Sequence, residues 1–245
     1  MQQPPKFMPD KELSKVGGSM SNSFKRSIKE LKFTFKPKET VDTLAMMYFL
    51  NYAIGIIGAL LSKFGLPDTS PDFSLNGSVL FNTFTFISVV ILAPIFEELI
   101  FRGMVLKNLT KYNKMFAIIV TSLLFGLLHL NITQAIPAFF MSLVLCYMYV
   151  QTDSILVTIL AHAGNNFLAL MSAYSNNILI TVLVLALVIY GLITVILKSK
   201  EVNAFIKEEK TSENWYARFF KRIPNLLYLI FTILWIIISL FMNMF

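Results

Sequence analysis

The sequence predicts an all-α membrane protein, a polytopic helical bundle of about seven transmembrane helices with an interfacial amphipathic helix near the N-terminus. Two observations predict this class. Hydrophobic residues make up 56% of the 245 residues, the mean hydropathy is +0.67, and charged residues make up 14% against roughly 25% in soluble domains. Nearly all Lys and Arg residues also fall in three segments of the chain.

Residues 1–40 form a basic tail ahead of a membrane domain that we assign to residues 41–245. Near the end of the tail, apolar residues recur at helical spacing and alternate with basic ones: Phe24, Ile28, Leu31 and Phe35 against Lys25, Arg26, Lys29 and Lys32. Because one face is apolar and the other cationic, this pattern predicts a helix that lies on the membrane surface.

Uncharged stretches predict the membrane spans, since a helix needs roughly 20 apolar residues to cross the hydrocarbon. They run over residues 43–62, 73–96, 115–152, 154–197 and 223–245. By length, the third and fourth stretches each hold two helices and the other three hold one each. The two long stretches are expected to fold back near Asn131 and near residues 175–177.

The positions of Lys and Arg predict the orientation. Residues 1–40 carry nine of them, residues 102–114 four and residues 198–222 seven, whereas Lys63 falls on the opposite side. Because cytoplasmic loops retain Lys and Arg, the N-terminus is predicted to be cytoplasmic. The excess of Lys over Arg, together with abundant Phe, Ile and Asn, is typical of an AT-rich genome and favours a bacterial plasma membrane. The net charge of +7 then reflects topology and the anionic headgroups of the lipid bilayer, with no nucleic-acid partner.

Three charges interrupt an apolar stretch in "PIFEELIFRG". Each of Glu97, Glu98 and Arg102 costs about 2.5 to 3.5 kcal/mol at a helix centre on insertion scales, so such residues indicate function. Glu98 and Arg102 are four residues apart and share a helix face, which predicts an ion pair. Glu97 points about 100° away and has no basic partner on its own helix. We therefore expect Glu97 to be the free base.

The chain contains two histidines, and both lie in predicted spans: His129 in "LLFGLLHLN" and His162 in "ILAHAGNNF". If the chain turns at "KYNK", Glu97 and His129 each lie about 24 Å along antiparallel helices, at one depth. A later turn before His162 places His162 about 14 Å and Asn166 about 20 Å along the next helix. These four side chains are expected to converge in the cytoplasmic half of the membrane, in a site that opens towards the cytoplasmic leaflet.

This set of groups suits hydrolysis of an amide bond inside the membrane. A free glutamate can act as a general base, one histidine can hold the water, and the other histidine with an asparagine amide can donate hydrogen bonds to the oxyanion. Glu97, His129 and His162 are also candidate ligands of zinc or another divalent metal. No HExxH motif occurs, and we favour a site that requires no cofactor.

Three motifs occur together and in order. "EELIFR" contains Glu97, Glu98 and Arg102, "FGLLH" contains Phe125 and His129, and "HAGNN" contains His162 and Asn166. They resemble the EExxxR, FxxxH and HxxxN signatures of the CPBP family, which comprises the type II CAAX prenyl endopeptidases and the bacterial bacteriocin-processing or Abi proteins. The resemblance covers a core of about residues 78–172.

The resemblance implies a fold, an activity and roles for these residues. Glu97 and His129 would activate water, His162 and Asn166 would form the oxyanion hole, and Glu98 with Arg102 would hold the site together. The substrate would be a membrane-associated peptide or protein. In bacteria the family is linked to peptide or pheromone maturation, bacteriocin processing and self-immunity. Its members are described both as metalloproteases and as glutamate-dependent proteases, and we favour the latter.

Two other functions use the same polar residues. A non-proteolytic immunity or scaffold protein that regulates a sensor or a toxin receptor would use them as structural groups. A proton-coupled transporter would also bury Glu and His, but it predicts internal repeats, and the sequence contains none. Loss of cleavage in Glu97 or His129 variants separates the protease from both.

Overall fold

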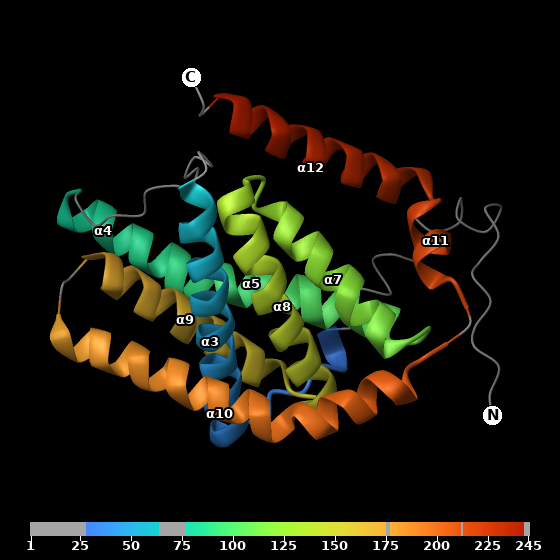
Figure 1. The fold of residues 1–245 in the computed structure, drawn as a ribbon, viewed down its shortest axis with the longest axis horizontal. Helices are drawn as coiled ribbons and strands as arrows, with labels where there is room; N and C mark the ends of the chain where they lie inside the picture. The colour runs from blue at the N-terminus through green and yellow to red at the C-terminus, as the bar shows by residue number, and fades with distance from the viewer. Residues whose placement is uncertain (1–27, 64–76, 175–176, 212, 243–245) are drawn as a thin grey trace.

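The computed structural model describes residues 28–63, 77–174, 177–211 and 213–242. Within these ranges the chain is almost entirely helical and contains no strand, which confirms the predicted all-α class (Figure 1). The main helices are α3 (Pro37–Ser62), α4 (Val79–Phe86), α5 (Ala93–Ile100), α6 (Lys107–Leu109), α7 (Lys114–Leu128), α8 (Ile132–Thr152), α9 (Ile155–Tyr174), α10 (Ile178–Glu208), α11 (Trp215–Phe220) and α12 (Ile223–Met242).

Seven apolar helical segments follow one another in the predicted order. In the described ranges, five are long and apolar enough to cross a membrane: Pro37–Ile57, Val79–Leu109, Ile132–Thr152, Ile155–Tyr174 and Ile178–Glu208. Two further segments are apolar but shorter, Lys114–Leu128 and Pro224–Ile238. Both predicted reversals are present, between α7 and α8 and between α9 and α10.

The second span is one continuous helix from Val79 to Leu109. Two π-helical segments interrupt its α-helical hydrogen bonding, η1 (Ile87–Leu92) and η2 (Phe101–Leu106), one on each side of α5. Such π-helical turns are rare and occur often at functional sites. The sequence does not predict them, and they flank the helical turn that carries both glutamates.

Part of the predicted amphipathic helix lies outside the described residues, and in the part within them only Ile28 and Lys29 are helical. Residues 31–36 have no regular secondary structure, and Phe24, Lys25 and Arg26 lie outside the described residues. The backbone here bonds to the α8–α9 turn instead, with the carbonyl oxygen of Lys32 accepting from Ile155 N–H at 3.0 Å and that of Thr34 from the Ser154 hydroxyl at 2.6 Å. These long-range bonds replace the intrahelical bonds on which a helix would depend.

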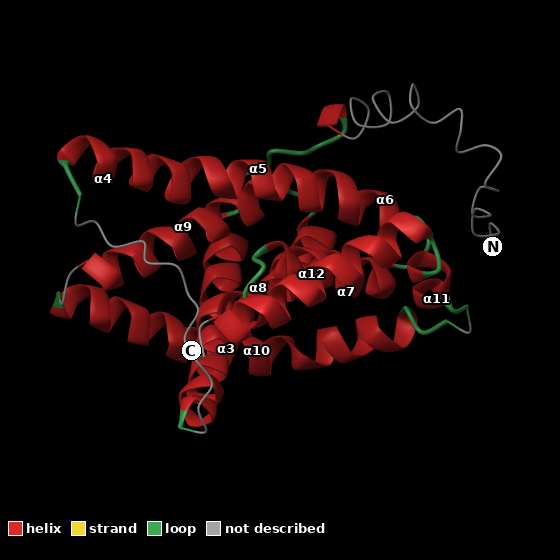
Figure 2. Ribbon diagram, turned by 90° about the horizontal axis from the view of Figure 1, so that it is seen from above, coloured by secondary structure: helices red, strands yellow, loops and turns green. Residues whose placement is uncertain are grey.

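The segments that carry most of the basic residues meet at one end of the bundle, as the charge bias predicts. Lys32 pairs with Asp153, Lys107 with Glu30, and Lys114 with Glu209. Figure 2 shows α6 and α11 at this end. We call it the basic end and use it below as the reference for direction within the bundle.

Close packing of α3 on α8, α9 and α10 holds the remaining helices around the second span. The crossing of α3 and α10 depends on Gly191, because a Cβ atom at this position would collide with the backbone of Ala45. In Figure 1, α10 runs along one edge of the bundle and α12 along the opposite edge. The helices between them, α5, α7, α8 and α9, surround the candidate site.

Candidate active site

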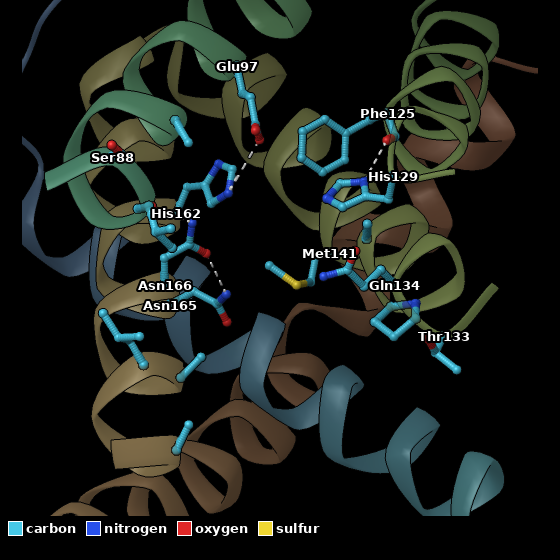
Figure 3. Close-up of a pocket in the computed structure, with 17 residues that line it drawn as sticks. Ser88, Glu97, Phe125, His129, Thr133, Gln134, Met141, His162, Asn165 and Asn166 are labelled. Carbon is cyan, nitrogen blue, oxygen red and sulfur yellow. Dashed lines mark hydrogen bonds and ion pairs between the residues drawn. The ribbon is translucent and has the colours of Figure 1, made fainter. Parts of the chain in front are cut away.

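A cavity of about 710 Å³ lies between two walls of helices (Figure 3). Residues of η1, α5 and α9 form one wall, and residues of α7 and α8 form the other. Among the residues that line the cavity, the polar ones are Ser88, Glu97, His129, Thr133, Gln134, His162, Asn165 and Asn166. All four residues predicted to form the site therefore face one space.

The predicted ion pair is present and fully buried. Arg102 Nη1 donates to Glu98 Oε1 at 2.9 Å, and both side chains are 0% exposed. Arg102 Nη2 also donates to the Ser142 hydroxyl at 2.8 Å, and the guanidinium lies over the Phe125 ring at 4.9 Å. A buried ion pair is tolerated only where further polar contacts surround it. Ser142 and the ring face provide part of them, while Glu98 Oε2 and Arg102 Nε have no hydrogen-bond partner among the described residues.

His162 lies between the two glutamates. Its Nδ1 is 2.9 Å from Glu98 Oε1, and its Nε2 is 3.7 Å from Glu97 Oε2. Because a carboxylate paired with Arg102 accepts hydrogen bonds, the Nδ1 hydrogen is committed to Glu98. The nitrogen that remains for chemistry is Nε2, which faces Glu97 and the cavity.

The two glutamates differ as the sequence predicts. The Glu98 side chain is completely buried, whereas the Glu97 side chain is 27% exposed and borders the cavity. Glu98 accepts hydrogen bonds from Arg102 and His162 and has no access to the cavity wall. Glu97 is the carboxylate that a bound molecule can reach.

His129 lies on the opposite wall, at the C-terminal end of α7. Its backbone N–H bonds to the Gly126 carbonyl, and its Nδ1 lies 3.1 Å from the Phe125 carbonyl oxygen. Because a carbonyl can only accept, Nδ1 carries the hydrogen and Nε2 is left as an acceptor. The Phe125 ring contacts both imidazoles, with centroid distances of 5.3 Å to His129 and 5.9 Å to His162. Phe125 thus fixes the spacing of the two histidines.

Asn166 is held by a bond that the π-helical segment makes available. Hydrogen bonds in η1 connect residues five apart, so the Val89 carbonyl would accept from residue 94. That residue is Pro94, which has no N–H. Asn166 Nδ2 donates to the Val89 carbonyl oxygen at 2.9 Å instead, and Asn165 Nδ2 donates to Asn166 Oδ1 at 3.2 Å. The second hydrogen on Asn166 Nδ2 remains for a group in the cavity.

Residues 79–168 match the family model described as type II CAAX prenyl endopeptidase Rce1-like, which confirms the resemblance read from the three motifs. These residues are similar to the Rce1-like family. The match spans a little over a third of the chain and includes all seven predicted site residues. Comparison with curated proteins and with solved structures gave no match. The Rce1-like match supports a CAAX-type intramembrane protease in general, with a peptide or protein substrate in a membrane.

The cavity of this Rce1-like core extends away from the basic end. On α9 its lining residues run from His162 to Ala173, away from the turn at Asp153. On α7 and α8 they lie close to the α7–α8 turn, which is remote from Lys114 and Thr152. The sequence places the site in the cytoplasmic half and predicts an opening on the basic, cytoplasmic side. Relative to the basic end, the cavity extends the other way, because the depth of a residue along its helix does not reveal on which side the packing leaves space. The depth of the site in the membrane and the orientation of the chain stay predictions.

Sequence reasoning missed several polar groups of the Rce1-like site. Ser142 follows Arg102 by forty positions, and its contact with Arg102 arises from helix packing. Asn165 immediately precedes the motif asparagine, and Gln134 lies two residues beyond the α7–α8 turn. Their signal in the sequence is weak, since polar residues near helix ends and turns are common.

The donor set was also compared with the needs of a metal ion. Across the part of the chain that the structure describes, no three His, Cys, Asp or Glu side chains are placed to hold a metal together. His162 Nδ1 bonds to Glu98 and His129 Nδ1 to the Phe125 carbonyl, while His129 lies on the wall opposite Glu97. The candidate ligands Glu97, His129 and His162 do not form a three-ligand set in this conformation, and no step below depends on a metal.

Proposed function

We propose that the chain is an intramembrane endopeptidase that hydrolyses a peptide bond with water activated by Glu97 and His129. The observation that carries this proposal is the arrangement of Glu97, His129, His162 and Asn166 around one cavity, while Glu98 is neutralised separately by Arg102. A carboxylate that borders the cavity, opposite an acceptor nitrogen, is suited to proton abstraction from water.

Attack by water begins the reaction. Water lies between Glu97 and His129 Nε2, and the acceptor state of this nitrogen orients one of its hydrogens. Glu97 removes the other proton as the water oxygen bonds to the carbonyl carbon and the carbonyl π electrons move to oxygen. The product is a tetrahedral oxyanion with a carboxylic acid at Glu97.

Hydrogen-bond donors on the α9 wall stabilise the oxyanion. Asn166 offers the second hydrogen of Nδ2, and His162 offers Nε2–H, which requires that both ring nitrogens carry hydrogen. Glu98, held by Arg102, keeps the ring in position through Nδ1. When the C–N bond breaks, the proton on Glu97 passes to the leaving nitrogen, which gives a carboxylate-side product and a free amine.

The remaining lining of the cavity indicates the type of substrate. Small and apolar residues surround the polar groups, among them Ala93, Ala138, Met141, Ala169 and Ala173. Such walls bind an apolar segment with little desolvation cost. A membrane-associated peptide therefore fits, in bacterial peptide or pheromone maturation or in self-immunity against bacteriocins.

A cleavage assay with purified protein in lipid nanodiscs tests the proposal, with a quenched farnesylated CAAX peptide and a quenched apolar peptide as probes. Glu97→Gln and His129→Ala should lose at least a hundredfold in kcat while their melting temperatures stay near that of wild type. Glu201→Gln, on the exposed surface of α10, is the matched control and should cleave normally. Cleavage should also survive EDTA.

Retained cleavage in both site variants would overturn the proposal. A cellular phenotype that survives Glu97→Gln in a well-folded protein would favour the scaffold function instead. Loss of cleavage with EDTA, restored by zinc, would replace the metal-free mechanism with a metal-dependent one at the same residues.

A further inference from the structure

Asn131 fixes the orientation of the groups at the start of α8. Its Oδ1 accepts from the backbone N–H of Gln134 at 2.8 Å, as a helix N-cap, and from the Thr133 hydroxyl at 3.0 Å. Its Nδ2 donates to the His129 carbonyl oxygen at 3.0 Å and to Gln134 Oε1 at 2.7 Å. With two donors at the oxygen and two acceptors at the nitrogen, the amide of Asn131 can adopt one orientation only.

This orientation determines which end of the Gln134 amide faces the cavity. Since Asn131 presents a donor, the atom of Gln134 that meets it must be the acceptor Oε1, and the NH₂ group is turned the other way. Gln134 is part of the cavity lining. Figure 3 shows its side chain reaching into the cavity from the wall opposite His162 and Asn166. The structure gives Gln134 Nε2 no protein acceptor among the described residues.

We propose that Gln134 Nε2 donates a hydrogen bond to a backbone carbonyl oxygen of the bound peptide. The assignment rests on the proposed function and adds a substrate-binding residue on the α8 wall. Glu97, His162 and Asn166 contact the scissile unit from one wall, and Gln134 holds a neighbouring carbonyl from the other. The peptide is thereby kept extended between the walls.

The acceptor is the carbonyl of an internal peptide bond rather than a terminal carboxylate. Among the described residues no Lys or Arg lines the cavity, and Glu97 would repel the carboxylate of a substrate. A neutral amide donor matches a neutral carbonyl. The substrate is therefore a peptide segment that continues through the cavity, with its C-terminus outside it.

The test uses full-length protein in nanodiscs and the two quenched peptides, each made with a C-terminal carboxylate and with a C-terminal amide. Gln134→Leu removes the donor. Asn131→Asp keeps the helix cap but replaces the donor with an acceptor, which turns the Gln134 NH₂ towards residue 131. Both variants should raise KM about tenfold, as expected for one lost hydrogen bond in a binding site, and Gln134→Leu should keep kcat within about twofold. Gln151→Leu, at the exposed end of the same helix, should leave KM unchanged.

The same peptides are also titrated into the Glu97→Gln protein, where binding is measured without cleavage. If Gln134→Leu and Asn131→Asp weaken binding of the peptides equally for both C-terminal forms, the assignment is supported. If wild type cleaves neither peptide, that result counts against the proposed function alone and leaves the binding test valid. An unchanged KM and unchanged affinity in Gln134→Leu would overturn the assignment and leave the protease function standing. A clear preference for the free carboxylate would overturn it as well, and absence of any peptide binding would overturn both.

Discussion

Adjacent glutamates have opposite environments at the centre of the site. Glu98 is enclosed with Arg102, Ser142 and His162, and Glu97 borders the cavity. One step along a helix rotates a side chain by about 100°, which is enough to separate a buried structural carboxylate from a reactive one. The ion pair thus serves the site indirectly, through the imidazole that it positions.

Replacement of Arg102 tests this indirect role. Arg102→Met should lower the free energy of unfolding by about 3 kcal/mol, because it leaves the carboxylate of Glu98 buried without its counter-charge. The double variant Glu98→Gln/Arg102→Met should recover much of that loss but not the activity, since the bond that holds His162 is weakened. Thermal unfolding in detergent and peptide cleavage measure the two effects. A double variant with full activity would show that the pair does not position His162.

Pro94 offers a second test at the residue scale. Pro94→Ala restores an N–H that can bond to the Val89 carbonyl and displace Asn166. The variant should be at least as stable as wild type, because Ala is a better helix residue than Pro, while kcat falls about tenfold. The effect should vanish in an Asn166→Ala background, where there is no amide to displace. Additive losses in the double variant would contradict the link.

At the scale of elements, the α7–α8 hairpin sets the wall that carries His129 and Gln134. The two helices approach closely at Gly126, where an added Cβ would lie 2.7 Å from the Ala135 carbonyl oxygen and 3.0 Å from Phe139 Cβ. The turn between them passes through Leu130, whose φ of 57° is unusual for a residue with a side chain. Backbone contact rather than side-chain choice therefore determines the position of this wall.

Gly126→Ala should separate the hairpin and lower both stability, by about 1 to 3 kcal/mol, and cleavage. Gly55→Ala is the matched control, since nothing lies within 4 Å of a Cβ atom placed there. It should be neutral or stabilising by up to about 1 kcal/mol. Melting temperatures and kcat/KM in the same lipid compare the two. Equal behaviour of the two variants would show that the close approach does not matter.

At the scale of the whole molecule, the cavity and the basic residues lie towards opposite ends. If the basic end is cytoplasmic, a substrate reaches the site from the external side of the membrane. This direction favours a peptide that is exported or inserted before it is cut. It also differs from the cytoplasmic approach that the sequence predicts.

Cysteine labelling in intact cells measures this direction. Ala173→Cys, at the cavity end of α9, should react with a membrane-impermeant maleimide added outside, and Thr211→Cys, at the basic end, should react only after lysis. The native Cys146 is buried and should contribute no background. The reverse labelling pattern would place the cavity on the cytoplasmic side.

Much of the fold and of the site follows from the sequence because helical spacing is regular. The Glu98–Arg102 pair needs only a four-residue interval, and the placement of Glu97 and His129 along one cavity needs only two helices of equal length from one turn. Their catalytic roles stay predictions. The Asn166 contact with Val89 was not predictable in the same way, because it depends on a π-helical register that tertiary packing selects. Residues 31–36 illustrate the same limit, since their amphipathic pattern is overridden by bonds to a turn more than a hundred residues away.

The ion pair has a further consequence for biogenesis. Glu98 and Arg102 meet within one helix, but the bond from His162 to Glu98 joins residues 64 positions apart. A nascent chain can thus form the Glu98–Arg102 pair as soon as that helix forms, whereas the imidazole of His162 arrives only with α9. Until then Glu97 has no complete site around it. We therefore expect ribosome-bound chains truncated before α9 to be membrane-integrated yet proteolytically silent, so that activity begins only when synthesis has passed the last residue the chemistry needs.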